Sequence, residues 1–144
     1  MILFLGIFLH FQETLDQEKY NLYGPPHSVS NLKLAKFKKP ANEKSVEKRL
    51  RVLREETQEF HHKFWTKHNT EFTEARKQFV NKLLKEKYSH EKNKKNVSAT
   101  EMSEFYKSFL DSRWSEHLNY NLEWQRRNFT ILYLGIRAKF QKLF

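Results

Sequence analysis

The sequence predicts an all-α protein, a small bundle of three to four helices with an extended N-terminal arm. Apolar residues recur at alternating steps of four and three over long stretches, which is the period of an amphipathic helix. The chain has only three glycines and three prolines among 144 residues, unlike a glycine-rich β protein. Aromatic residues make up 15% of it, which argues against disorder.

The N-terminal part divides into two predicted segments. Residues 1–22 are predicted to be an atypical, poorly ordered leader: Met1 to Phe11 is apolar but lacks the basic region and small-residue cleavage site of a secretory signal. Residues 23–44 are predicted to be an extended arm, because no helical or strand period persists there and Gly24-Pro25-Pro26 marks a turn. We expect this arm to be a packed or partly ordered tail rather than a partner-binding arm.

Residues 45–144 are predicted to form the helical domain. A first helix begins near Ser45, and His68-Asn69-Thr70 is predicted to break it, with Asn69 or Thr70 as the N-cap of a second helix. Residues 89–96 are predicted to be a solvated loop. The stripe of the first helix consists of Val46, Leu50, Leu53, Thr57, Phe60 and Phe64.

Two further helices follow in the prediction. Ser98-Ala99-Thr100-Glu101 matches a capping box and should start the third helix. Its buried face is predicted to consist of Met102, Phe105, Tyr106, Phe109 and Leu110. A break or kink is expected at residues 119–121, before the fourth helix. The apolar residues of that helix are Leu122, Phe129, Leu132, Tyr133, Ile136, Phe140 and Leu143.

Catalysis and metal binding find little support in the sequence. With no cysteine there is no disulfide, thiolate metal site or thiol catalysis. Of the seven histidines, His61 and His62 are adjacent and point to different sides of a helix, and Glu59 to His62 supplies only one Glu-x-x-His motif. Phosphate loops, nucleophile elbows and His-Glu-x-x-His motifs are absent. We therefore predict no enzyme, no cofactor and no metal.

The segment from Tyr120 to Ile136 is the candidate docking surface. The net charge of +10 favours an anionic partner, and the apolar run within this segment is far too short to cross a bilayer. For Trp124 and Phe129 the favoured interpretation is closure of the core against Phe60 and Phe64. The candidate residues for docking to a partner or a membrane are Tyr120, Trp124, Arg126, Arg127, Tyr133, Arg137 and Lys139.

A series of blocks in one order resembles the cytochrome c oxidase assembly factor 8 family, also called apoptogenic protein 1 of mitochondria. The resemblance spans about Tyr23 to Phe140. Its blocks are Tyr23-Gly24-Pro25-Pro26, Ser30-Asn31-Leu32, Glu47, Leu50-Arg51, Leu53-Arg54, Glu56-Thr57-Gln58-Glu59, Phe64-Trp65, Glu101-Met102, Phe105-Tyr106-Lys107, Phe109-Leu110, Tyr120-Asn121, Trp124 and Arg127-Asn128-Phe129.

The resemblance implies a non-enzymatic mitochondrial protein, peripheral on the matrix side of the inner membrane. Such a protein supports the assembly of cytochrome c oxidase (complex IV) and its protection from oxidative damage, with a link to apoptosis. Its expected partners are a complex IV subunit or assembly intermediate and the inner-membrane surface. Residues 1–22 do not resemble the family's presequence, so localisation comes from the resemblance alone.

The alternative function is a basic, helical RNA-binding protein of the mitochondrial matrix. Arginines interleaved with Trp65, Tyr120 and Trp124 are compatible with pairing to phosphates and stacking on bases. No recognised reader motif occurs, and aromatic residues at helical spacing are more often core. We therefore rank RNA below the membrane and complex IV, and we expect no DNA partner.

Overall fold

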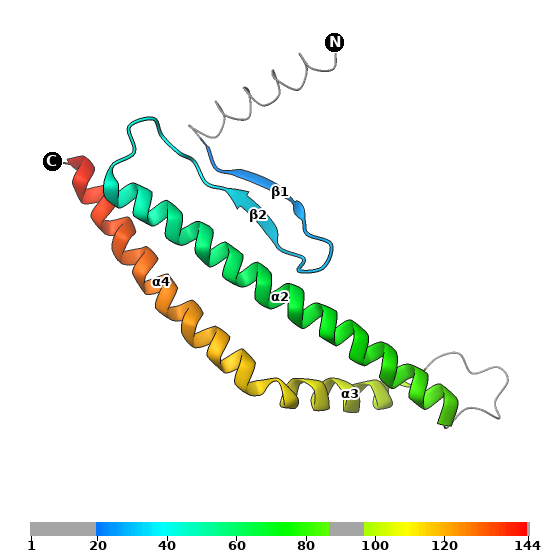
Figure 1. The fold of residues 1–144 in the computed structure, drawn as a ribbon. Helices are drawn as coiled ribbons and strands as arrows, with labels where there is room; N and C mark the ends of the chain where they lie inside the picture. The colour runs from blue at the N-terminus through cyan, green and yellow to red at the C-terminus, as the bar shows by residue number, and fades with distance from the viewer. Residues whose placement is uncertain (1–19, 87–96, 144) are drawn as a thin grey trace, which may run out of the picture.

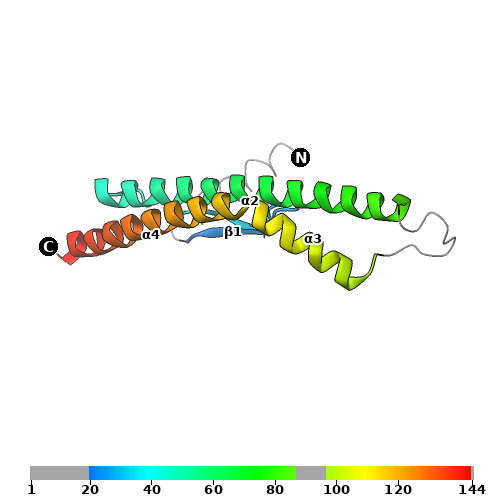
Figure 2. The ribbon, with the colours of Figure 1, turned by 90° about the horizontal axis from the view of Figure 1, so that it is seen from below.

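The computed structural model describes residues 20–86 and 97–143, and this part is mostly helical with a small two-stranded sheet. The predicted all-α class therefore needs correction. A β-hairpin of β1 (Leu22–Pro26) and β2 (Lys33–Lys36) precedes three helices, α2 (Ser45–Glu86), α3 (Ala99–Ser112) and α4 (Trp114–Leu143). Figures 1 and 2 show α3 and α4 returning along α2, and Figure 1 shows the hairpin on the other side of α2. Residues 1–19 of the predicted leader (1–22) and the predicted loop, 89–96, lie outside the described residues, and Leu22 already belongs to β1.

The predicted extended arm is in fact a hairpin. β1 and β2 pair antiparallel, with Leu22 opposite Lys36, and the ladder is irregular between Tyr23 and Pro26. Gly24-Pro25-Pro26 lies within β1, and the turn follows it, where Asn31 adopts a positive φ of 59°. Proline donates no backbone hydrogen bond and suits only edge strands, which explains why no strand pattern is visible in the sequence.

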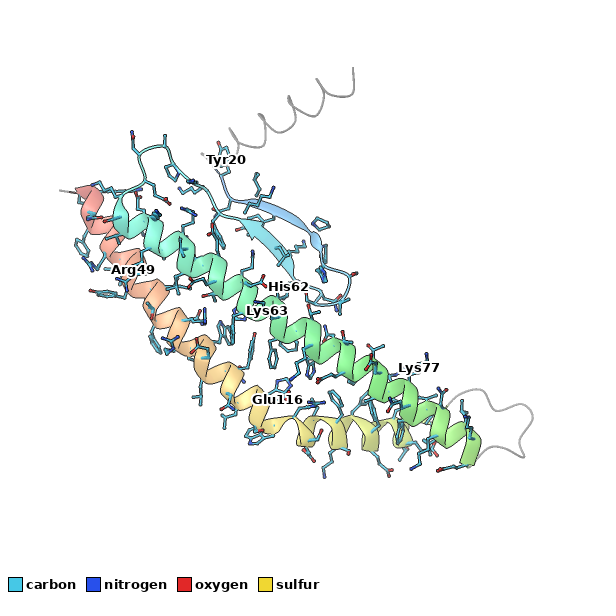
Figure 3. All side chains as sticks on the ribbon, viewed as in Figure 1. Tyr20, Arg49, His62, Lys63, Lys77 and Glu116 are labelled. Atoms are coloured by element: carbon cyan, nitrogen blue, oxygen red, sulfur yellow. The ribbon has the colours of Figure 1, made fainter. Side chains whose placement is uncertain are left out.

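Polar side chains of α2 attach the hairpin. The amide of Gln58 accepts a hydrogen bond from the backbone N–H of Ala35 at 2.6 Å and donates one to its carbonyl at 3.1 Å, as a neighbouring strand would. Figure 3 shows His62 on the hairpin side of α2. Two further hydrogen bonds join α2 to the turn, from His62 Nδ1 to Ser30 Oγ at 3.0 Å and from Asn69 Nδ2 to Val29 O at 2.8 Å.

Helix α2 is continuous for 42 residues, so the break predicted at residues 68–70 is wrong. Asn69 does not cap a helix, because its side chain bonds to the hairpin instead. The capping box at Ser98 and Glu101 is confirmed as the start of α3. Its predicted buried face is wrong in part, because Tyr106 and Leu110 are 41% and 54% exposed and only Phe105 and Phe109 are buried. The break expected at residues 119–121 lies earlier, at Arg113 between α3 and α4.

The core lies along the contact between α2 and the helices that return beside it. At one end Val46 and Leu50 of α2 pack with Leu134 and Ala138 of α4, and Leu134 is only 2% exposed. An ion pair between Glu47 and Lys142, 2.7 Å apart, joins the same two helices. At the other end, aromatic rings from α2 and α3 meet, namely Phe72, Phe79, Phe105, Tyr106 and Phe109.

Candidate docking face on helix α4

Tyr120 is half-buried between α2 and α4, between the cluster around Leu134 and the aromatic cluster around Phe105. Its hydroxyl accepts a hydrogen bond from Trp65 Nε1 at 3.0 Å and is 2.7 Å from His61 Nδ1. Its ring stacks on Phe64 with centroids 4.0 Å apart. Burial raises the pKa of Tyr120, and burial followed by the charge of Arg127 lowers the pKa of His61. These contacts make Tyr120 a packing residue rather than an anchor for an outside partner.

Two further histidines, His68 and His117, extend this layer of aromatic rings between α2 and α4. His68 and His117 meet edge to face with ring centroids 4.7 Å apart, beside Phe64. Burial, followed by the neighbouring His117 and Arg113, lowers the pKa of His68, so its neutral form is favoured. No group of three or more metal-ligating side chains occurs among the residues that the structure describes. The layer is therefore best understood as packing between α2 and α4.

The two adjacent arginines of α4 differ in environment. Both bond to Glu123, with Arg126 Nε at 2.7 Å and Arg127 Nε at 2.6 Å from its carboxylate oxygens. The hydrogen bonds from Arg126 and then Arg127 lower the pKa of Glu123 to about 2. Arg127 is 20% exposed and lies over the ring of Phe60, whereas Arg126 is 70% exposed. Only Arg126 is thus accessible to a partner along most of its length.

Helix α4 carries a second apolar stripe that nothing in the described chain covers. The expectation that Phe129 closes the core is wrong, since it is 69% exposed, and Trp124 is 38% exposed with one edge against His61. We call the exposed stripe the outer face of α4. Its members recur at steps of three, four and seven, apart from the adjacent pair Leu132 and Tyr133, and they are Leu118, Leu122, Phe129, Leu132, Tyr133, Ile136, Phe140 and Leu143.

The stripe selected from the sequence is thus the exposed one, and the packing stripe is different. Ile131, Leu134 and Ala138 make the contact with α2. They lie on the opposite side of the helix from Leu132 and Ile136, at about 100° per residue. The sequence contained both stripes, but the step pattern alone does not say which one has a partner in the same chain.

Basic residues accompany the outer face. From Trp124 to Leu143, α4 has no acidic residue and five basic ones. Arg137 lies over the ring of Tyr133, with its guanidinium carbon 5.7 Å from the ring centroid. Of the predicted docking residues, the structure therefore brings Arg126, Tyr133, Arg137 and Lys139 to the exposed side. It leaves Tyr120 and Arg127 half-buried against α2 and Trp124 at the boundary.

The chain is similar to known proteins over most of its length. A family model described as cytochrome c oxidase assembly factor 8 matches residues 20–144. The chain belongs to this family. Rat cytochrome c oxidase assembly factor 8 is 36% identical over 131 residues, which are 88% of this chain and 68% of the rat protein. The mouse protein is 38% identical over 121 residues, 81% of this chain and 63% of its own length.

A more distant animal relative gives the same result. A mitochondrial COA8 family protein of Drosophila melanogaster is 38% identical over 125 residues, 87% of this chain and 68% of the fly protein. The chain thus spans about two thirds of the length of these relatives. No solved structure matches.

Some of the blocks that resemble this family have structural roles in this chain. In Glu56-Thr57-Gln58-Glu59, Thr57 is 6% exposed and Gln58 holds β2. The C-terminal block that begins at Tyr120 contributes both to the interior and, through Phe129, to the outer face. None of the described helices is long and apolar enough to span a bilayer.

Proposed function

We propose that the protein is a non-enzymatic mitochondrial factor for cytochrome c oxidase assembly, acting as a peripheral scaffold on the matrix side of the inner membrane. Membership of the family supports the pathway, because the relatives are named as assembly factors of this oxidase. The single observation that carries the mode of action is the outer face of α4. The protection from oxidative damage and the link to apoptosis rest on kinship alone.

The outer face suits a membrane surface. A helix of 30 residues is about 45 Å long, and its exposed apolar side is continuous with basic residues and free of acids beyond Glu123. Amphipathic helices of this kind lie in the plane of the interface, with their apolar side at the acyl boundary and their cations near anionic head groups. We therefore propose an anionic lipid surface as the partner of the outer face.

The rest of the molecule remains available to a protein partner in this orientation. The inner face of α4 packs on α2, and in the view of Figure 1 the hairpin lies along the other edge of α2. A molecule resting on lipid through the outer face of α4 would leave exposed residues of the hairpin, such as Tyr23, which is 69% exposed, available for contact. A subunit or assembly intermediate of the oxidase is the partner expected there.

The function is tested by complementation. In cells that lack the protein, wild type should restore complex IV abundance on native gels and oxidase activity. The double substitution Phe129→Ser, Tyr133→Ser should restore neither while its abundance and fold are retained. The matched control is Leu110→Ser, because Leu110 is 54% exposed but lies on α3. Normal complex IV in cells lacking the protein would contradict the pathway, and full rescue by the double variant would contradict the role of the outer face.

A further inference from the structure

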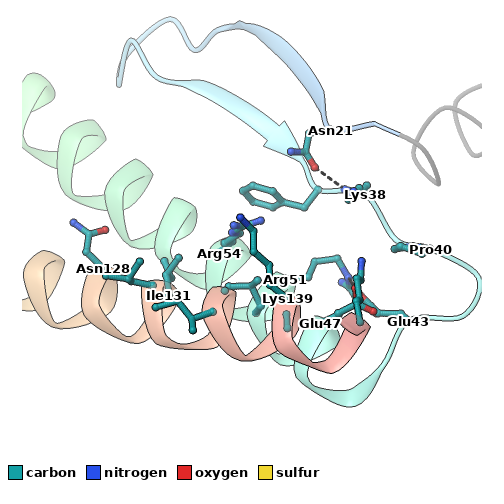
Figure 4. Close-up of a pocket in the computed structure, with 17 residues that line it drawn as sticks. Asn21, Lys38, Pro40, Glu43, Glu47, Arg51, Arg54, Asn128, Ile131 and Lys139 are labelled. Atoms are coloured by element: carbon teal, nitrogen blue, oxygen red, sulfur yellow. Dashed lines mark hydrogen bonds and ion pairs between the residues drawn. The ribbon is translucent and has the colours of Figure 1, made fainter. Parts of the chain in front are cut away.

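A trough lies between the segment after β2, helix α2 and helix α4. Its first part has a volume of about 520 Å³ (Figure 4). A second cavity of about 520 Å³ continues beneath β2 toward Tyr120. Phe37, Arg54 and Ile131 line both, so the two cavities are adjacent. Each volume lies within the range of sites for small ligands.

The walls of the trough are largely apolar. Phe37 lies on one side, Ile131 and Leu132 come from α4, and Leu50 from α2. The second cavity adds Leu34 and the rings of Trp65 and Trp124. Leu132 and Ile136 belong both to the first cavity and to the outer face of α4. The apolar lining of the first cavity is therefore continuous with that face at these two residues.

The charges around the first cavity do not cancel. Glu43 is bound by Arg51 at 2.8 Å, and Glu47 by Lys142 at 2.7 Å, and these hydrogen bonds lower the pKa values of both glutamates. Both acids are thus ionised and already neutralised. The cations that remain on the lining are Lys38, Arg54 and Lys139.

Arg54 is the centre of this excess. It lies where the two cavities meet, and Figure 4 shows it beside the trough. Within the described ranges 20–86 and 97–143 its guanidinium has no hydrogen bond or ion pair, whereas Arg51, one turn earlier, bonds to both Glu43 and Glu55. A guanidinium is a strong, directional donor for carboxylate and phosphate oxygens.

We propose that this trough is a binding site for an anionic amphiphile, with the hydrocarbon chain along Leu132, Ile131 and Phe37 toward Trp124 and the phosphate or carboxylate head on Arg54. Lys38 and Lys139 add to the positive potential at the head group. The site does not depend on docking of α4 to a membrane, because it would take up a single dissolved amphiphile. A fatty acid and a single-chain phospholipid share the required chemistry.

Tryptophan fluorescence can read out this site. Trp65 and Trp124 line the second cavity, and the third tryptophan, Trp114, lines neither. The probes are brominated amphiphiles used below their critical micelle concentration: a fatty acid, a lysophosphatidic acid and an uncharged alcohol of equal chain length. We expect saturable quenching by one or both anionic probes at concentrations at which the alcohol quenches at least about tenfold less. The two anionic probes distinguish a carboxylate from a phosphate head group.

Two substitutions test the assignment of residues. Arg54→Gln should weaken anionic quenching by about tenfold or more. Arg49 (labelled in Figure 3) is likewise an exposed arginine of α2 but lines neither cavity, so Arg49→Gln should leave quenching unchanged. Gly135→Leu should abolish quenching by occupying the first cavity, since a Cβ at Gly135 meets no atom within 4 Å.

The outcomes are separable from those for the outer face. Phe129→Ser should retain anionic quenching even where it abolishes rescue of complex IV. The proposal is overturned if no probe quenches saturably, if the alcohol quenches as well as the anionic probes, or if Arg54→Gln behaves like Arg49→Gln.

Discussion

The inner and outer faces of α4 have similar composition but opposite environments. Leu134 on the inner face is 2% exposed, whereas Leu132, two residues earlier, is 60% exposed. Both are leucines at the same level of one helix, and only the first meets a partner from α2. The comparison shows that an apolar stripe is evidence of a contact but does not say whether the contact lies within the chain.

The largest expected effect compares those two leucines. Leu134→Ala should lower the free energy of unfolding by about 2 to 5 kcal/mol, because it leaves a cavity between α2 and α4. Leu132→Ala should change it by less than about 0.5 kcal/mol. Urea denaturation of both variants measures the difference. Equal losses would mean that Leu132 is also packed within the free protein.

A smaller effect is expected from two tyrosines of α4, Tyr120 on the inner face and Tyr133 on the outer face. Tyr120→Phe keeps the stacked ring but removes the acceptor of the Trp65 hydrogen bond, so it should cost about 1 kcal/mol. Tyr133→Phe, at a side chain that is 57% exposed, should be neutral in the same urea titration. A neutral Tyr120→Phe would show that its hydrogen bonds do not stabilise the inner face.

Features formed by residues close in sequence could be predicted, whereas those formed by residues distant in sequence could not. The capping box of α3 was readable because it is local, formed by Ser98 and Glu101 three residues apart. The hairpin and the unbroken α2 were not, because both depend on contacts distant in sequence, such as Gln58 with Ala35 and Asn69 with Val29. For the docking site, the sequence located the segment but not which arginine is exposed, since Glu123 bonds to both.

The smallest expected effect is a pH dependence of the free energy of unfolding, caused by two histidines between α2 and α4. Burial lowers the pKa values of His61 and His68, so the unfolded chain binds protons more readily than the folded one near their ordinary pKa of about 6.5. The stability contributed by the neutral forms of these two histidines is then fully present above about pH 6.5, and it is lost as the pH decreases through the lowered pKa values of the folded state. Urea unfolding between about pH 8 and pH 5.5 should show this fall.

The control for this profile is the double substitution His61→Asn, His68→Asn, which should flatten it. The paired glutamates do not interfere, because their pKa values are lowered and their contribution is lost only in more acidic solution, below about pH 4.5. A profile of the double variant that is as steep as the parent's would assign the pH dependence to other groups.

The most direct test of the central claim is flotation of the purified protein with lipid vesicles. Wild type should float with vesicles that contain an anionic phospholipid, and less so with neutral ones or in high salt. Phe129→Ser, Tyr133→Ser should remain in the dense fraction, while Leu110→Ser floats like wild type. Flotation of the double variant equal to that of wild type would contradict the assignment of the outer face of α4 to the membrane.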